Sequence, residues 1–174
     1  MNNIQLFFGK PVTSPCLIPV LHTSTPACIN QPFMVGAESF GVTALSFGTA
    51  HGAVFVDDVD TIDVNKIGEA LGNHPLFPNG ASIVFVQTLD KESVKARLWQ
   101  FGCGEIDATP EAICVAGTTA MMLQKVLKSD VKVSMGNNNY CVRWDRGKGV
   151  SLIEIPDFFQ IQFVKTRGTA GISA

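Results

Sequence analysis

Short apolar stretches, either alternating with polar residues or running without interruption, recur along the chain and indicate β-strands. Residues 81–89 and 94–101 are expected to form an antiparallel pair. Further strands are predicted at 4–8, at two or three places within 34–59, and in a meander over 131–135, 139–144, 149–155 and 158–164. Five prolines within residues 11–33 predict an extended, irregular segment, with one short strand at 17–21.

Two segments switch to the helical period. Apolar residues recur at helical spacing over about 64–72, and Asp63 stands where a helix N-cap belongs. A longer helix is predicted over about 110–128, with Thr109 as N-cap and Pro110 at the first helical position. Residues 112–123 carry no charge, so this helix has no polar face and should be buried nearly all round.

These elements predict an α+β fold in one domain over residues 1–174, with a core over about 4–164 and a tail over 165–174. The sheet should be mostly antiparallel and should curl, barrel-like, around the buried helix 110–128. The helix 64–72 should lie outside it. A composition of 46% apolar and 16% charged residues fits such extensive burial.

Charge and cysteine content narrow the possible partners. A net charge of −2 and a pI of about 5.9 argue against nucleic acid or an anionic membrane as a partner. No apolar run is long enough to span a bilayer, and the N-terminus lacks the features of a signal peptide, so we expect a cytoplasmic protein. Five scattered cysteines predict reduced thiols, and neither a metal site nor a cofactor is expected.

Three stretches in a fixed order carry a resemblance to a known family: SFGTAHGAVFVDDVD, GNHPLFPNGASIVFVQ and RLWQFGCGE. Together they resemble the C-terminal half of diaminopimelate epimerase, a cofactor-independent isomerase family of lysine biosynthesis. The similarity runs from about Ile4 to about Gln160. It implies one of the two lobes of that fold, each a curled sheet around a central helix. The other lobe, with its Cys-Gly-Asn-Gly motif, has no counterpart in these residues.

The resemblance also implies where a catalytic centre would lie. Thr109 stands at the place of the family's second catalytic cysteine and is the first catalytic candidate, although a threonine hydroxyl needs an activating partner to act as a base. Pro110 and Glu111 occupy the turn whose backbone N–H groups hold the substrate carboxylate in the family. Proline has no N–H to offer, and a glutamate repels a carboxylate. Cys103 is a second catalytic candidate, or simply a packed turn residue.

The family's substrate-binding positions are mostly substituted as well. Thr49 and Ser82 stand in place of two asparagines, and Gln100 and Phe101 in place of a Glu-Arg pair. The retained members are His51 and Glu105, which frame the family's site; His51 could equally be a structural core histidine.

Two functions therefore stay open. The chain is either a catalytically degenerate binding or scaffold domain, or a cofactor-independent epimerase, racemase or related lyase acting on a small amino acid. In both cases the expected partner is a second copy, giving a homodimer, or a separate N-terminal lobe. The second function would need such a partner to complete the site. The expected ligand is small and amino-acid-like.

Overall fold

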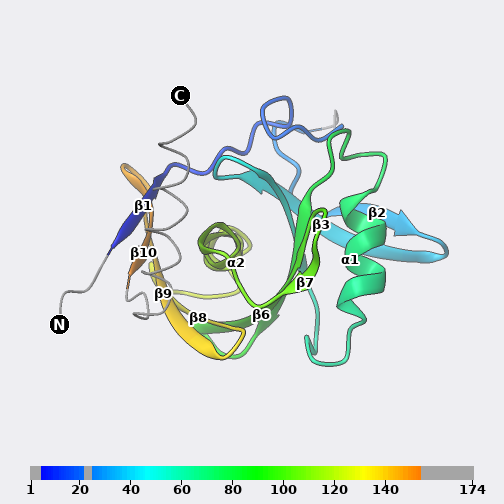
Figure 1. The fold of residues 1–174 in the computed structure, drawn as a ribbon. Helices are drawn as coiled ribbons and strands as arrows, with labels where there is room; N and C mark the ends of the chain where they lie inside the picture. Colours follow the sequence, from blue (N-terminus) through cyan, green and yellow to red (C-terminus); the bar gives the residue numbers. More distant parts are fainter. Residues whose placement is uncertain (1–4, 22–24, 154–174) are drawn as a thin grey trace, which may run out of the picture.

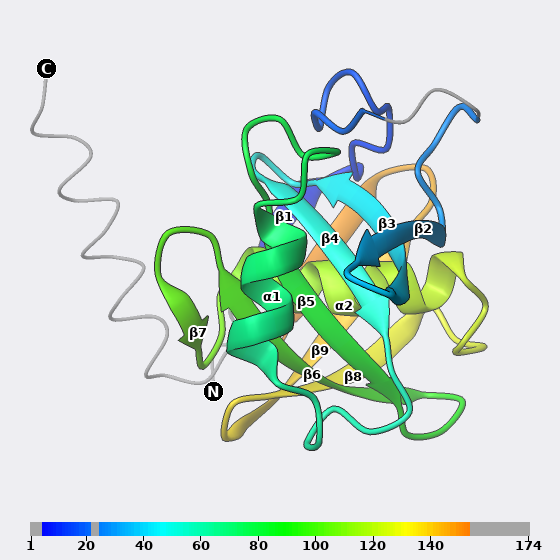
Figure 2. The same ribbon diagram turned by 90° about the vertical axis from the view of Figure 1, so that its right-hand side faces the viewer.

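One long sheet curls around a helix, and a second helix lies on the outside of the curl (Figures 1 and 2). The structure is a computed structural model that describes residues 5–21 and 25–153. In chain order its elements are β1 (Leu6–Gly9), β2 (Gln31–Val35), β3 (Glu38–Ser46), β4 (Ala50–Phe55), α1 (Val64–Gly72), β5 (Ser82–Thr88), β6 (Ser93–Gln100), β7 (Gly104–Ile106), α2 (Pro110–Met122), β8 (Asp130–Met135), β9 (Asn138–Asp145) and β10 (Gly149–Ile153).

The sheet runs in the order β1-β10-β9-β8-β6-β5-β4-β3-β2, with β7 attached to β6. It is mostly antiparallel, as predicted, but it does not close into a barrel. Within the described chain, one isolated bridge between Val12 and Ser46 joins the segment after β1 to β3. Pro11 and Pro15 flank this bridge and have no N–H with which to continue a ladder. The expected barrel is therefore an open, curled sheet.

The two parallel strand pairs place the two helices on opposite faces. β4 pairs parallel with β5, and β6 pairs parallel with β8. The first pair is connected through α1 and the second through α2. The second pair runs opposite to the first because β5 and β6 are antiparallel. Two crossovers of the right-handed kind that proteins favour then put one helix outside the curl and the other inside.

β5 separates two hydrophobic cores and contributes to both. Val84 and Val86 face the core inside the curl, where α2 lies. Ile83 and Phe85 face the outer core, which also contains residues of α1 and of the proline-rich segment. Successive side chains of a strand point to opposite faces, so a nearly continuous apolar run is what a strand buried on both sides requires.

Helix α1 lies directly on Trp99 of β6. Gly68 and Gly72 are one turn apart, and a Cβ atom on either would overlap the Trp99 side chain. The start of this helix is capped as predicted, because the Asp63 carboxylate accepts the N–H of Lys66 at 3.1 Å. Asn73 ends it. The helix is thereby fixed against the strand that leads into residues 100–101.

Helix α2 is buried nearly all round, as its uncharged sequence predicted. Eleven of its 13 residues are buried. Gly117 allows close packing on β9, since a Cβ there would lie 2.7 Å from the Cβ of Val142. None of the helices in the described ranges is long and apolar enough to cross a membrane.

The predicted end of the central helix at residue 128 is wrong, because α2 ends at Met122. Gln124 adopts a left-handed backbone conformation with φ 55°. The N–H groups of Gln124 and Lys125 then donate to the carbonyls of Met121 and Ala120, closing the helix in a Schellman motif. Glycine is the usual residue at this position, so a glutamine there gives little sequence signal.

Three further differences concern short segments. The strand predicted at 17–21 is wrong, because residues 15–19 form a turn in which the Ser14 carbonyl accepts two N–H groups. The three-residue strand β7 was not predicted. The strand predicted at 149–155 is described as far as Ile153, and the segments 158–164 and 165–174 lie outside the described residues.

The contact between α1 and Trp99 leads to a stability prediction. Gly68→Ala should gain about 1 kcal/mol of helix propensity but lose more through overlap with Trp99, for a net loss of about 1–3 kcal/mol. Urea denaturation measures the change. Glu69→Ala, at the neighbouring exposed position, is the matched control and should stay within about 0.5 kcal/mol of wild type. Equal or higher stability for Gly68→Ala would contradict the packing described.

Candidate functional site

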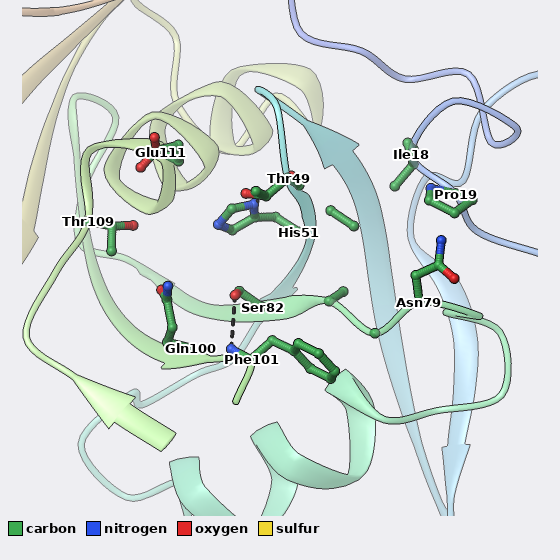
Figure 3. Close-up of a pocket in the computed structure, with 13 residues that line it drawn as sticks. Ile18, Pro19, Thr49, His51, Asn79, Ser82, Gln100, Phe101, Thr109 and Glu111 are labelled. Carbon is green, nitrogen blue, oxygen red and sulfur yellow. Dashed lines mark hydrogen bonds between the residues drawn. The ribbon is translucent and has the colours of Figure 1, made fainter. Parts of the chain in front are cut away.

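A pocket of about 510 Å³ lies at the N-terminal end of α2 (Figure 3). It is formed where β4 and β5 begin, β6 ends and α2 starts. Seven of the positions predicted from the sequence line it: Thr49, His51, Ser82, Gln100, Phe101, Thr109 and Glu111.

Strand register explains why positions so far apart in the sequence meet here. His51 stands opposite Ser82 in the parallel β4–β5 pair. β5 and β6 are antiparallel, so the start of β5 lies beside the end of β6. A hydrogen bond joins these two ends, since the backbone N–H of Phe101 donates to the Ser82 hydroxyl at 3.0 Å. The floor of the pocket is thus part of the sheet itself.

Six lining residues were not predicted: Ile18, Pro19, Ala50, Asn79, Gly80 and Ala81. Four of them adjoin predicted positions along β4 or the loop before β5, and proximity to Thr49, His51 and Ser82 could have identified them. Ile18 and Pro19 come from the proline-rich segment, which carries no local signal for the pocket. Figure 3 shows them across the pocket from Thr109 and Glu111.

His51 is the most buried polar residue of the pocket, with 3% of its surface exposed. Its Nδ1 atom lies 3.0 Å from the backbone carbonyl oxygen of Thr49. Burial lowers the pKa of His51 below its usual 6.5, while the Thr49 carbonyl and the Glu111 carboxylate act in the opposite direction. The ring is therefore neutral at pH 7. Because a carbonyl can only accept, Nδ1 carries the hydrogen and Nε2 is left as an acceptor.

The first turn of α2 is capped by residues of the helix start itself. The Thr109 hydroxyl accepts the N–H of Ala112 at 3.1 Å, and Thr109 has the extended backbone of an N-cap. Pro110 is buried at the first helical position and has no N–H. The half-buried carboxylate of Glu111 has no hydrogen bond or ion pair to any described residue and lines the pocket. The end of the helix that would attract an anion carries an anion of its own.

Phe101 provides an apolar wall. Its ring packs against Gly80, where a Cβ atom would overlap it, and forms a T-shaped pair with Trp99 at a centroid distance of 6.3 Å. The side chain still has 45% of its surface exposed. Gln100 and Phe101 place no positive charge in the pocket.

The other predicted positions lie elsewhere. Glu105 forms a two-pronged ion pair with Arg97, at 2.8 and 3.0 Å, and lines a separate hollow. Cys103 is exposed in the turn between β6 and β7 and does not line the pocket. Pro110 supports the helix start but is not a lining residue.

No cysteine is among the described residues that line this pocket, and the two buried thiols are poor nucleophiles. Cys114 is fully buried in α2, and burial strongly raises its pKa, so the reactive thiolate is disfavoured. Cys28 is also buried, and its pKa is raised for the same reason. In the part of the chain that the structure describes, no group of three His, Cys, Asp or Glu side chains could hold a metal ion.

Comparison with solved structures supports the fold. A hydroxyproline epimerase from Agrobacterium vitis, solved with bound trans-4-hydroxy-L-proline, matches 87% of this chain and 49% of its own, with a TM-score of 0.59. The two sequences are 12% identical, so this likeness concerns the fold alone.

Sequence comparison identifies the family. The diaminopimelate epimerase of Carboxydothermus hydrogenoformans is 32% identical over 152 residues, covering 86% of this chain and 53% of that protein. The diaminopimelate epimerase of Leptospira biflexa is 30% identical over 147 residues, covering 84% and 52%. The chain therefore spans about half the length of these relatives. The family model for diaminopimelate epimerase matches residues 43–153, which contain both helices and most of the sheet. The chain belongs to the diaminopimelate epimerase family.

Proposed function

We propose that this chain is a catalytically degenerate member of its family that acts as a small-molecule binding or scaffold domain. The observation that carries the proposal is the start of α2. There the hydroxyl of Thr109 caps the helix, Pro110 removes a donor, and Glu111 adds a negative charge. The resemblance assigns a catalytic cysteine and a carboxylate-binding turn to the same three positions.

Proton removal and carboxylate binding, the two requirements of the family reaction, both lack the groups that the family uses for them among the described residues of this pocket. Removing an α-proton requires a base of suitable pKa, and a threonine hydroxyl cannot serve without an activating partner. A substrate carboxylate about 5 Å from Glu111 would be repelled by about 3 kcal/mol at an effective dielectric constant of about 20, which is more than a hundredfold in affinity. No lysine or arginine is among the described residues that line the pocket to offset this repulsion.

The proposed partner is a second copy of the chain or a separate N-terminal lobe. Leu17 and Leu21 are 70% and 59% exposed and flank the lining residues Ile18 and Pro19. Phe101, another lining residue of the pocket, is 45% exposed, so exposed apolar residues stand at or next to lining positions along the chain. Exposed apolar patches of this kind mark interaction surfaces. Twofold pairing of identical chains is the simplest way to cover one.

A second candidate function is a cofactor-independent isomerase or lyase that acts on a small amino acid once a partner completes the site. The observation that favours it is His51. Its neutral ring presents an unprotonated Nε2 without a partner among the described residues, and in Figure 3 it points toward Thr109 and Glu111. A neutral imidazole is a competent general base.

Solvent exchange separates the two candidates. The purified chain in D2O should place no deuterium at the α-carbon of any member of an amino-acid panel, as measured by NMR. A full-length diaminopimelate epimerase serves as the positive control. Deuterium incorporation that is lost in Thr109→Ala would contradict the proposed degeneracy. Incorporation that requires an added Cys-Gly-Asn-Gly lobe would favour the second candidate.

His51 should make stability depend on pH. Its pKa is lowered in the folded state, so the unfolded chain binds its proton at higher pH, and the stabilisation present above pH 6.5 is lost as the pH falls. The free energy of unfolding should therefore fall less steeply between about pH 7 and pH 5 in His51→Gln than in wild type. Urea titrations at several pH values measure both slopes. Equal slopes would contradict a buried, neutral His51.

Self-association tests the proposed partner surface. We expect a dimer at micromolar concentration by sedimentation velocity, and Leu17→Ser should weaken it by about tenfold. Leu127 is equally exposed, at 70%, but follows the C-terminal end of α2, away from the pocket. Leu127→Ser is therefore the matched control and should leave the dimer intact. A monomer that also fails to bind a separate N-terminal lobe would contradict the proposed surface.

A further inference from the structure

We infer that the pocket at the start of α2 binds a small ligand with a primary ammonium group and no carboxylate beside it. The inference rests on the proposed function, because it assigns a ligand class to the same pocket. It departs from the family's substrates, which are zwitterionic amino acids.

The negative charge in the pocket indicates that the ligand is a cation. Among the described lining residues, Glu111 carries the one formal charge. Its carboxylate has no hydrogen bond or ion pair to a described residue, although it is half-buried. The partial positive charge at a helix N-terminus, equivalent to about half a proton charge, offsets only part of it. A ligand that brings a positive charge would complete this site, whereas a ligand that brings a carboxylate would place two anions side by side.

The free acceptor atom of His51 indicates that the ligand is a hydrogen-bond donor. The residue is 97% buried and lines the pocket, and its Nδ1–H is committed to the Thr49 carbonyl at 3.0 Å. Nε2 is left as an acceptor without a partner among the described residues. Glu111 lies near enough to influence the ring electrostatically. A carboxylate and an imidazole acceptor on neighbouring walls match an ammonium group, which has three donors and no acceptor.

The opposite side of the pocket suits an unbranched apolar chain. Ile18 and Pro19 lie across from Thr109 and Glu111 in Figure 3, and the Phe101 ring adds an aromatic face. Asn79 lies beside Pro19 and adds one polar amide to this side. Methylene groups can pack against these side chains while the ammonium group reaches α2. An aromatic face also attracts a cation that passes over it. The pocket thus combines an acceptor end with a mostly apolar end, where Asn79 is the one polar side chain of the described lining residues beside Ile18 and Pro19.

Three probes of matched length distinguish the ligand classes: pentylammonium, pentanoate and norleucine. Binding to the full chain is measured by NMR titration. Pentylammonium should saturate the wild type at millimolar concentration, with shifts at His51 and Phe101. Pentanoate should show no saturable binding, and norleucine should bind more weakly than pentylammonium. Tighter binding of pentanoate or norleucine, or no saturable binding of pentylammonium, would overturn the inference.

Variants test the counter-ion. Glu111→Gln should weaken pentylammonium binding by about 10- to 100-fold, and Glu111→Asp should retain most of it because the charge is kept. Glu69→Gln removes an exposed helical carboxylate outside the pocket and should leave binding unchanged. Unchanged affinity in Glu111→Gln would refute the assignment. Exchange at the α-carbon of an amino acid would instead refute the proposed function, so the two failures can be told apart.

Discussion

Burial of an uncharged helix is the constraint on which the rest of the fold depends. Helix α2 has no polar face, so water must be excluded around almost its whole circumference. A flat sheet covers one side of a helix, whereas this curled sheet surrounds α2 (Figure 1). Its strands supply apolar side chains to the core around the helix. The pocket borders the N-terminal end of α2, where Thr109 and Glu111 meet the ends of the surrounding strands.

The free N–H groups at that helix end can bond either to the protein itself or to a ligand. The first turn of any helix has N–H groups without helical partners, and an anion or a capping side chain can satisfy them. Here Thr109 accepts one such N–H, and Pro110 has none to offer. The carboxylate of Glu111 adds a charge of the sign that the helix dipole favours. Three adjacent residues thus set the chemistry of this helix end, on a fold that the chain shares with its family.

The sequence predicted an element well where the interactions that define it join residues only a few positions apart. The caps Asp63 and Thr109 identified both helix starts, because the side-chain oxygen bonds an N–H three residues later. The end of α2 escaped prediction, since Gln124 adopts a left-handed conformation that glycine usually marks. β7 escaped as well. It is three residues long, and its pairing with β6 defines it more than any pattern of its own.

The sequence by itself determined the buried central helix, its capped start, the positions of most strands along the chain and, through resemblance, seven of the residues that line the pocket. Only the tertiary structure decided that Ile18 and Pro19 complete the pocket, that Glu105 turns instead to Arg97, and that the sheet stays open. The physical reason is how far apart in the sequence the interacting residues lie. A cap or an apolar period is set by neighbours along the chain, whereas pocket walls and sheet closure depend on register between distant strands, which no single segment specifies.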